Sequence, residues 1–243
     1  MKILKLGQML GGSNAPSGAG FENLYSLDFD GVNDYVNIAN ITESQGIDSL
    51  SVSAWVKPAA ELTNMIIAKH AGGTSGSWYL AIPSADTFRF VILNASSTRV
   101  EHDVSYTITL GQWYHLVGVY NGTDIKLYIN GVETGVASSQ TGLIKTVTTS
   151  VRIGTYQNNA WFFQGNIDEV ALFDTDLSGA EASAIYNSGV PTDLSGESDL
   201  IGYWRNGDPN GTAAFPTITD DSSNSYNGTM TNMASGDIVT VVP

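Results

Sequence analysis

The chain contains no cysteine, so neither a disulfide framework nor a thiolate metal site contributes to its fold or chemistry. Charged residues are also scarce, at 14% of the 243 residues, and 10 basic side chains stand against 24 acidic ones. The net charge of -14 repels phosphate backbones and anionic membranes, and we therefore expect no nucleic-acid partner. Most of the carboxylates are expected to form a solvated acidic surface.

Long hydrophobic runs are missing too. No segment is apolar over a length that would span a bilayer, so no membrane insertion is expected. Near the N-terminus the apolar residues are interrupted by Lys5, Gly7 and Gln8, which argues against a cleaved signal peptide. Residues 1–24 are rich in Gly, Ser and Asn, and we expect a flexible N-terminal arm or linker there.

Hydrophobic residues, at 42%, and glycine, with 26 residues, are plentiful, which is typical of short strands joined by tight turns. Residues 50–57 alternate with the period of two expected of a strand that has one face in a core. Asn130-Gly131 between two apolar runs predicts a hairpin with a type I′ turn. Further strands are predicted near residues 64–69, 77–82, 87–94, 98–104, 113–120, 125–130, 132–136, 150–156 and 166–173.

One short helix is predicted over residues 178–188. Ser178 and Glu181 have the S-x-x-E spacing of a capping box, in which each side chain accepts from a backbone amide that the first turn leaves free. Gly189 supplies the C-terminal stop, because glycine readily adopts the left-handed conformation in which many helices end.

Five segments resemble, in order and spacing, the laminin-G-like, concanavalin A-like jelly-roll family. They are YSLDFDGVNDYVNI at 25–38, LSVSAWVK at 50–57, WYHLVGVY at 113–120, KLYING at 126–131 and GNIDEVALF at 165–173. The resemblance covers roughly residues 25–190 and implies an all-β fold, a two-sheet antiparallel jelly-roll sandwich. This sandwich hosts lectins, adhesion modules, structural domains and glycosidases, so the fold alone does not decide the function.

The C-terminal segment resembles the strands that usually open such a domain, yet here it follows the domain. Either it begins a second repeat that is cut short, or the chain is a circular permutation in which residues 198–243 complete the sandwich. We favour the permutation, with one domain over 25–243, because a short repeat could not bury its own apolar face. Trp204 is then expected to plug the sandwich.

The resemblance also implies a structural Ca2+ ion between the loop after the first strand and the strand that carries IDEV. Asp30 and Asp168 match the family's ligands, and Gly31 and Asn33 are candidate carbonyl or amide donors, in keeping with the oxygen ligands that calcium prefers. The alternative is that Asp30 and Asn33 only make turn hydrogen bonds and that Asp168 caps a strand end.

Enzymatic activity is not expected. Glycosidases of this fold usually carry Glu-x-Asp-x-Glu on one strand, and the nearest match, Glu101 with Asp103, lacks the second glutamate. Asp168 and Glu169 are adjacent, so on a regular strand their side chains point to opposite faces and do not act together.

The three histidines do not have the spacing of a metal site. His115 lies in a segment where the family commonly packs histidine within the sheet, and we expect a hydrogen-bonded core residue. His102, between Glu101 and Asp103, is expected to face solvent on its strand, with a metal role as the alternative.

Residues 156–162 have the composition of a glycan-binding loop. Such sites combine aromatic faces for stacking on sugar rings with polar groups for the hydroxyls. Tyr156, Asn158 and Trp161 are the candidate ligand-binding residues, and the alternative for Trp161 is that it only covers the sheet edge. Trp55 and Trp78 are expected to be packed strand residues, because the alternation of their strands already explains them.

The sequence therefore favours a non-enzymatic recognition or structural module. A likeness to domains of phage structural proteins, with no export signal, points to a virion protein of a tailed phage, as a capsid decoration or part of a fibre. Its partners would be other virion proteins, further copies of itself, or cell-surface glycans. The alternatives are a carbohydrate-binding or adhesion module of a bacterial extracellular protein and a degenerate glycosidase.

Overall fold

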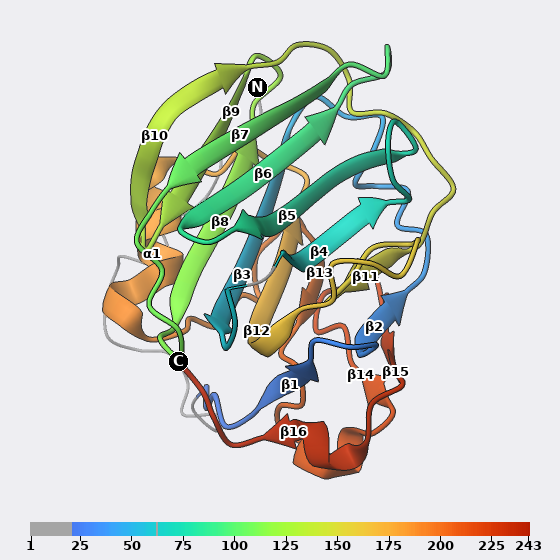
Figure 1. The fold of residues 1–243 in the computed structure, drawn as a ribbon, viewed down its shortest axis with the longest axis vertical. Helices are drawn as coiled ribbons and strands as arrows, with labels where there is room; N and C mark the ends of the chain where they lie inside the picture. Colours follow the sequence, from blue (N-terminus) through green and yellow to red (C-terminus); the bar gives the residue numbers. More distant parts are fainter. Residues whose placement is uncertain (1–20, 62) are drawn as a thin grey trace.

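The computed structural model describes residues 21–61 and 63–243. They form two stacked antiparallel sheets with one short α-helix (Figure 1), which confirms the predicted all-β jelly-roll sandwich. Sheet A has the order β10-β9-β8-β3-β12-β1-β16, with β13 also paired to β12. Sheet B has the order β14-β15-β2-β11-β4-β5-β6-β7.

The strands lie close to the ranges that the alternation predicts. Those of sheet A are β1 (Ser26–Asp30), β3 (Leu50–Pro58), β8 (Tyr114–Tyr120), β9 (Asp124–Ile129), β10 (Val132–Ser139), β12 (Gln164–Phe173), β13 (Leu200–Trp204) and β16 (Ile238–Val239). Those of sheet B are β2 (Tyr35–Ile38), β4 (Asn64–His70), β5 (Gly76–Ser84), β6 (Thr87–Leu93), β7 (Arg99–Ser105), β11 (Val151–Ile153), β14 (Thr217–Ile218) and β15 (Gly228–Thr231).

The hairpin between β9 and β10 turns at Asn130 and Gly131, as predicted. Both residues have positive φ, 50° and 75°, as a type I′ turn requires, and Ile129 pairs with Val132 across the turn.

The main core lies between the two sheets and is lined by the inward side chains of both. Trp78 and Trp204 are fully buried there, as expected of a packed strand residue and of a plug. A second apolar cluster covers the outer face of sheet A, where the helix α1 (Gly179–Tyr186) packs. Trp55 belongs to this side and is buried against Tyr186, with ring centroids 5.7 Å apart.

The predicted capping box of the helix is present. Ser178 Oγ accepts from Glu181 N, and the Glu181 carboxylate accepts from Ser178 N. The α-helix ends earlier than predicted, because Asn187 adopts the left-handed conformation in place of Gly189. A single 3₁₀ turn (Asn187–Gly189) follows.

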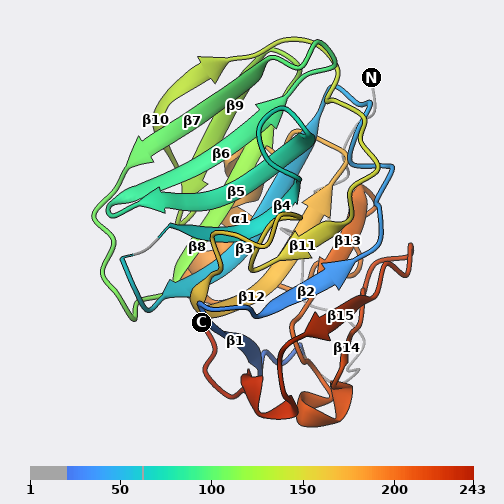
Figure 2. The same ribbon diagram turned by 45° about the vertical axis from the view of Figure 1, so that its right-hand side comes forward.

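The C-terminal segment contributes strands to both sheets. β13 pairs with β12 and β16 pairs with β1 in sheet A, whereas β14 and β15 extend sheet B beyond β2. Figure 2 shows β15, in dark red, beside β2, in blue.

The predicted N-terminal arm falls largely outside the described part of the chain, which begins at residue 21. Residues 21–24 are fixed to the C-terminal segment. Leu24 N donates to both oxygens of Asp208, and the Arg205 guanidinium lies over the Phe21 ring, 4.4 Å from its centroid. Residues 21–24 of the predicted arm are therefore in contact with the C-terminal segment, and residues 1–20 lie outside the described part.

The prediction for His102 is wrong. Its side chain is 2% exposed, because β10 folds over β7 and Ser138 Oγ lies 3.0 Å from His102 Nδ1. His115 is fully buried with its Nε2 2.9 Å from Ser53 Oγ, as expected of a core histidine, and burial lowers its pKa to about 3.

Candidate functional site

An aromatic pocket lies on the outer face of sheet B. Part of its lining comes from the loop between β11 and β12, whose backbone passes beside β4 in Figure 1. The cavity has a volume of about 110 Å³. Its lining consists of Met65, His70, Gly72, Gly73, Tyr79, Arg99, Tyr156 and Trp161. The loop and strands β4, β5 and β7 therefore build it together.

The predicted glycan-binding residues Tyr156 and Trp161 meet in this pocket. Their ring centroids are 6.1 Å apart at an interplanar angle of 79°. Trp161 also stands edge-on to Tyr79, at 6.5 Å, and Tyr156 lies 5.7 Å from the His70 ring. Asn158 is exposed at the rim, and its amide nitrogen lies 2.8 Å from the position that a Cβ on Gly72 would occupy.

The loop is held in place by hydrogen bonds to the sheet. Met65 N donates to Trp161 O (2.8 Å), and Gln157 N donates to His70 O (2.9 Å). Arg152 Nη1 donates to Asn159 Oδ1 at 2.5 Å. Trp161 has φ +58°, a genuine outlier for a bulky residue, and such strain concentrates at ligand sites.

The polar side of the pocket consists of His70 and Arg99. Burial, with Arg99 as the second cause, lowers the pKa of His70 to about 4, so the imidazole is neutral near pH 7. Arg99 donates to the Tyr79 hydroxyl and pairs with Glu101 at 2.6 Å. Glu101 is shared with Arg89 (2.8 Å), which in turn pairs with Asp103 (2.5 Å). The pocket thus offers rigid aromatic faces and hydrogen-bonding groups with little net charge.

Sequence reasoning missed His70, Tyr79 and Arg99. The alternation in β5 contained a usable signal, because Trp78 is buried in the core and Tyr79, one residue on, must therefore point to the outer face. His70 and Arg99 come from other strands, and only the order β4-β5-β6-β7 brings them to Tyr79.

The predicted calcium residues are not brought together. Asp30 pairs with Gln164 across the β1–β12 ladder, whereas Asp168 lies four residues further along β12. At about 3.3 Å per residue the two positions are roughly 13 Å apart along the strand, too far for one ion to contact both carboxylates.

The loop after β1 is occupied by its own hydrogen bonds. Asp30 Oδ1 accepts from Val32 N (2.7 Å) and Asn33 N (3.1 Å), which is the turn arrangement expected if the loop holds no metal. Asn33 O accepts from Asn232 Nδ2, and Gly31, at φ +77°, lies so close to Gln164 that a Cβ would come within 2.8 Å of it.

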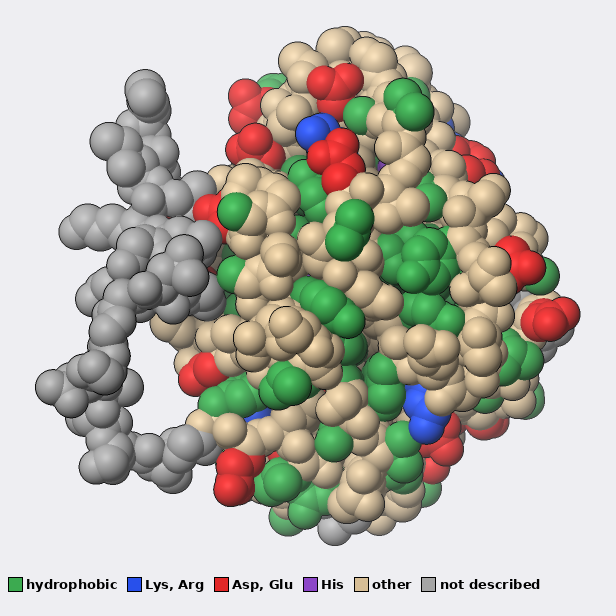
Figure 3. All heavy atoms as spheres, turned by 90° about the vertical axis from the view of Figure 1, so that its left-hand side faces the viewer, with side chains coloured by type: hydrophobic (Ala, Val, Ile, Leu, Met, Phe, Trp, Pro, Cys, Tyr) green, Lys and Arg blue, Asp and Glu red, His purple; other side chains and the backbone are tan. Residues whose placement is uncertain are grey.

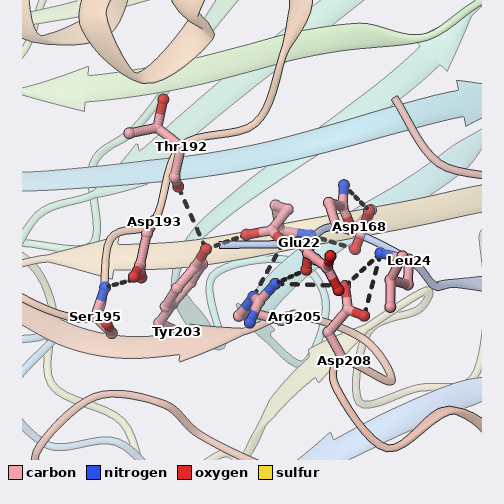
Figure 4. Close-up of polar contacts among 11 residues, drawn as sticks. Glu22, Leu24, Asp168, Thr192, Asp193, Ser195, Tyr203, Arg205 and Asp208 are labelled. Atoms are coloured by element: carbon pink, nitrogen blue, oxygen red, sulfur yellow. Dashed lines mark hydrogen bonds and ion pairs between the residues drawn. The ribbon is translucent and has the colours of Figure 1, made fainter. Parts of the chain in front are cut away.

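Asp168 instead belongs to a buried polar cluster on the outer face of sheet A (Figure 4). Its carboxylate accepts from Asn23 Nδ2 (3.0 Å) and Glu169 N (2.8 Å). Burial and then the neighbouring Glu169 carboxylate raise the pKa of Asp168 well above its usual range. The expectation that these two side chains diverge is wrong, because β12 has a bulge here and Glu169 adopts φ +46°.

Arg205 supplies the positive charge of the cluster. It pairs with Glu169 at 3.3 Å, and its Nη2 lies 3.5 Å from Asp208 Oδ2. Glu169 also accepts from the Tyr203 hydroxyl. Burial is the largest cause that raises the pKa of Glu169, against the hydrogen bonds that lower it.

One observation favours a calcium ion in this cluster, and one speaks against it. Asn23 Oδ1 and Asn206 Oδ1 are buried without a hydrogen-bond partner in the described part of the chain, and such oxygens suit calcium. However, within residues 21–61 and 63–243 no three His, Asp or Glu side chains are placed to hold a metal ion together.

Comparison with known proteins settles the family. The family model described as the concanavalin A-like lectin/glucanases superfamily matches residues 30–183, well over half of the chain. The chain belongs to this superfamily.

Similar proteins are distant in sequence. The adhesion G-protein coupled receptor V1 of Danio rerio is 21% identical over 166 residues, which make up 65% of this chain and 3% of the receptor. A candidate carbohydrate-binding protein from Bacteroides ovatus ATCC 8483 superposes with a TM-score of 0.65 at 17% identity, over 91% of this chain and 61% of that one. Domain 4 of AbnA, an extracellular arabinanase of Geobacillus stearothermophilus solved with arabinotriose, has a TM-score of 0.50 at 20% identity, over 70% and 84%.

The shared lengths are limited. The chain spans a small fraction of the receptor and less than two thirds of the Bacteroides protein. None of the three is described as a virion protein. No helix among the described residues is long and apolar enough to cross a membrane.

Proposed function

We propose that this concanavalin A-like domain is a carbohydrate-recognition module that acts outside the cell or at a cell surface, with a sugar ring bound in the aromatic pocket. The single observation that carries the proposal is the convergence of Tyr79, Tyr156 and Trp161 around one cavity. Aromatic faces beside a few polar groups are the composition expected of a small-ligand site.

The relatives support the same class of function. The Bacteroides protein is described as a candidate carbohydrate binder, AbnA domain 4 was solved with arabinotriose, and the zebrafish receptor is an adhesion protein. Glycans outside or on the surface of a cell are therefore the partners we propose.

The proposed module binds its ligand without transforming it. A retaining glycosidase needs one carboxyl group as acid and a second as nucleophile beside the sugar. The two carboxylates of β7 are instead held in ion pairs, Glu101 with both Arg89 and Arg99, and Asp103 with Arg89. Incubation of any bound glycan with the protein should leave it uncleaved.

The test is a glycan array followed by titration calorimetry on the glycans that bind. Trp161→Ala should weaken binding by at least about tenfold, the loss typical of removing a central aromatic contact. Phe162→Ala is the matched control, because Phe162 is the next residue of the same loop and does not line the pocket. Thermal melting of both variants verifies that the fold is kept.

Two results would contradict the proposal. One is a wild-type protein that binds no glycan on the array. The other is a folded Trp161→Ala variant that binds as tightly as the wild type, since the pocket would then not be the binding site.

A further inference from the structure

The proposed carbohydrate function leaves open which sugars the pocket accepts. The charged side chains around the pocket indicate whether a sugar with a carboxylate can bind there. Arg99 is the one cationic side chain among the lining residues. A lone arginine in a sugar site would favour a carboxylated sugar, because the guanidinium fork pairs with a carboxylate through two hydrogen bonds. What matters is therefore whether Arg99 is free to make such a pair.

The Nη2 nitrogen of Arg99 already has two polar partners. It lies 2.6 Å from Glu101 Oε1 and also donates to the Tyr79 hydroxyl, and the guanidinium sits 5.5 Å from the centroid of the Tyr79 ring. An incoming carboxylate would have to compete with Glu101, whose charge already neutralises that of Arg99 and which Arg89 holds from the other side at 2.8 Å.

The neighbouring ion pairs leave no surplus of positive charge. Glu101 and Asp103 on β7 face Arg89 and Arg99, so two carboxylates stand against two guanidinium groups. His70 adds none near pH 7, because burial keeps its imidazole neutral. The whole chain carries a net charge of -14, and Figure 3 shows acidic side chains spread over one face with few basic ones among them. A carboxylated glycan is therefore repelled at long range, and at short range it meets a guanidinium whose charge is already neutralised by Glu101.

The size of the cavity limits the occupant as well. Its volume of about 110 Å³ is well below the roughly 300 Å³ at which pockets for larger ligands begin. A cavity of this volume leaves room for one sugar ring at most, so further sugars of a chain must lie outside it.

We propose that the pocket binds a single uncharged sugar ring, and that the Arg99–Glu101 ion pair excludes sialic and uronic acids from it. Hydroxyl groups suit this lining because each can both donate and accept, so they satisfy a neutral imidazole and a paired guanidinium without displacing Glu101. The inference rests on the proposed carbohydrate function and adds the chemical class of the ligand.

The experiment compares matched glycan pairs by titration calorimetry at low and high salt. The pairs differ only at the terminal residue, such as galactose against sialylated galactose, or glucose against glucuronic acid. The wild type should bind the neutral member at least about tenfold more tightly, with little effect of salt, because no net charge is neutralised.

The decisive variant is Glu101→Gln, which leaves the Arg99 charge without its carboxylate. It should gain affinity for the carboxylated members by about tenfold, the order of one charge-assisted hydrogen bond, and this gain should fall with added salt. Asp103→Asn is the matched control. It removes a carboxylate from the same strand that pairs with Arg89 but not with Arg99, so the preference should not change.

Preference of the wild type for the carboxylated glycans would overturn this inference and leave the carbohydrate function standing. So would an equal gain in Asp103→Asn and Glu101→Gln, since the effect would then be one of general charge. A wild type that binds no glycan of either kind overturns the carbohydrate function and the inference with it.

Discussion

Trp161 reaches the aromatic pocket through a backbone conformation that large residues rarely adopt. A positive φ of 58° costs on the order of 1 to 3 kcal/mol and persists only where the surroundings fix it. The hydrogen bond from Met65 N to Trp161 O and the edge-on contact with Tyr79 supply that fixation. The indole is therefore held in position before a ligand arrives, which reduces the entropy lost on binding.

Asp34 is the residue whose titration should be visible in the stability of the domain. Its side chain is 5% exposed, and burial, together with the carboxylates of Asp30, Asp237 and Asp28, raises its pKa to about 6 against the hydrogen bond from Asp30 N. A raised pKa in the folded state favours the protonated form. Its stabilising contribution is therefore complete below about pH 4 and is lost as the pH rises through about 6.

Asp34→Asn keeps an oxygen that can accept from Asp30 N and removes the charge, so it should stabilise the protein at neutral pH. Two pKa units correspond to about 3 kcal/mol, which solvent screening reduces to the order of 1 kcal/mol. Urea denaturation at pH 7.5 should show this increase in the free energy of unfolding, and denaturation at pH 4 should not. The exposed Asp176→Asn serves as control, and an equal gain in both variants would contradict the prediction.

For single residues, the sequence predicted which residue types form the candidate sites better than it predicted where the fold places them. The pairing of Tyr156 with Trp161 was within reach, because both lie in one short loop with the residue types of a sugar site. The separation of Asp30 from Asp168 could not be predicted. Matching a motif gives the types of the ligand residues, but it does not give the register between β1 and β12. The proximity of Asp168 and Glu169 depends on a bulge that no alternation pattern indicates.

At the scale of the element, β12 is the strand on which the two halves of the chain meet. It pairs with β3, β1 and β13, and its bulge after Asp168 carries two carboxylates into one buried cluster. A strand over residues 166–173 was predictable from GNIDEVALF, as were the strands at 50–57 and 113–120 and the β9–β10 turn. The residue at which α1 ends was harder to predict, because Asn187 and Gly189 both adopt the left-handed conformation that ends a helix.

A calcium ion bound at the Asp168 cluster would stabilise the fold, because a ligand that binds only the folded state adds to its stability. We predict that a chelator lowers the melting temperature of the wild type by about 5 °C or more at an ion concentration about a hundredfold above the dissociation constant. Asp168→Ala should abolish the difference. Asp30→Ala should keep it, because Asp30 lies at the other end of the ladder. A wild-type melting curve that the chelator leaves unchanged would argue against a bound ion.

At the scale of the whole molecule, the C-terminal segment is part of the sandwich's framework. β13 adds to sheet A beside β12, β14 and β15 add to sheet B, and Trp204 is fully buried in the main core, where its Nε1 donates to Tyr226 O. The likeness of this segment to the opening of related domains predicted strands, and only the structure shows which neighbours they pair with.

A chain truncated after residue 197 should therefore fail to fold. It loses the partners of β1, β2 and β12 together with a core tryptophan, a loss that exceeds the roughly 5 to 15 kcal/mol by which domains of this kind are stable. Circular dichroism and a urea titration would show no cooperative transition. Addition of residues 198–243 as a separate peptide should restore one, and a truncated chain that melts cooperatively by itself would contradict the prediction.

The pairing of β1 with β16 has a further consequence. Ser26 lies opposite Val239 and Leu27 opposite Ile238, so the first and last strands form a seam, and the polypeptide approximates a ring opened there. A short linker across that seam, with a new opening at the exposed turn near Gly196, would leave each strand beside its present neighbours. The relinked protein would place the segment after Gly196 in front of β1, the order that such domains usually have.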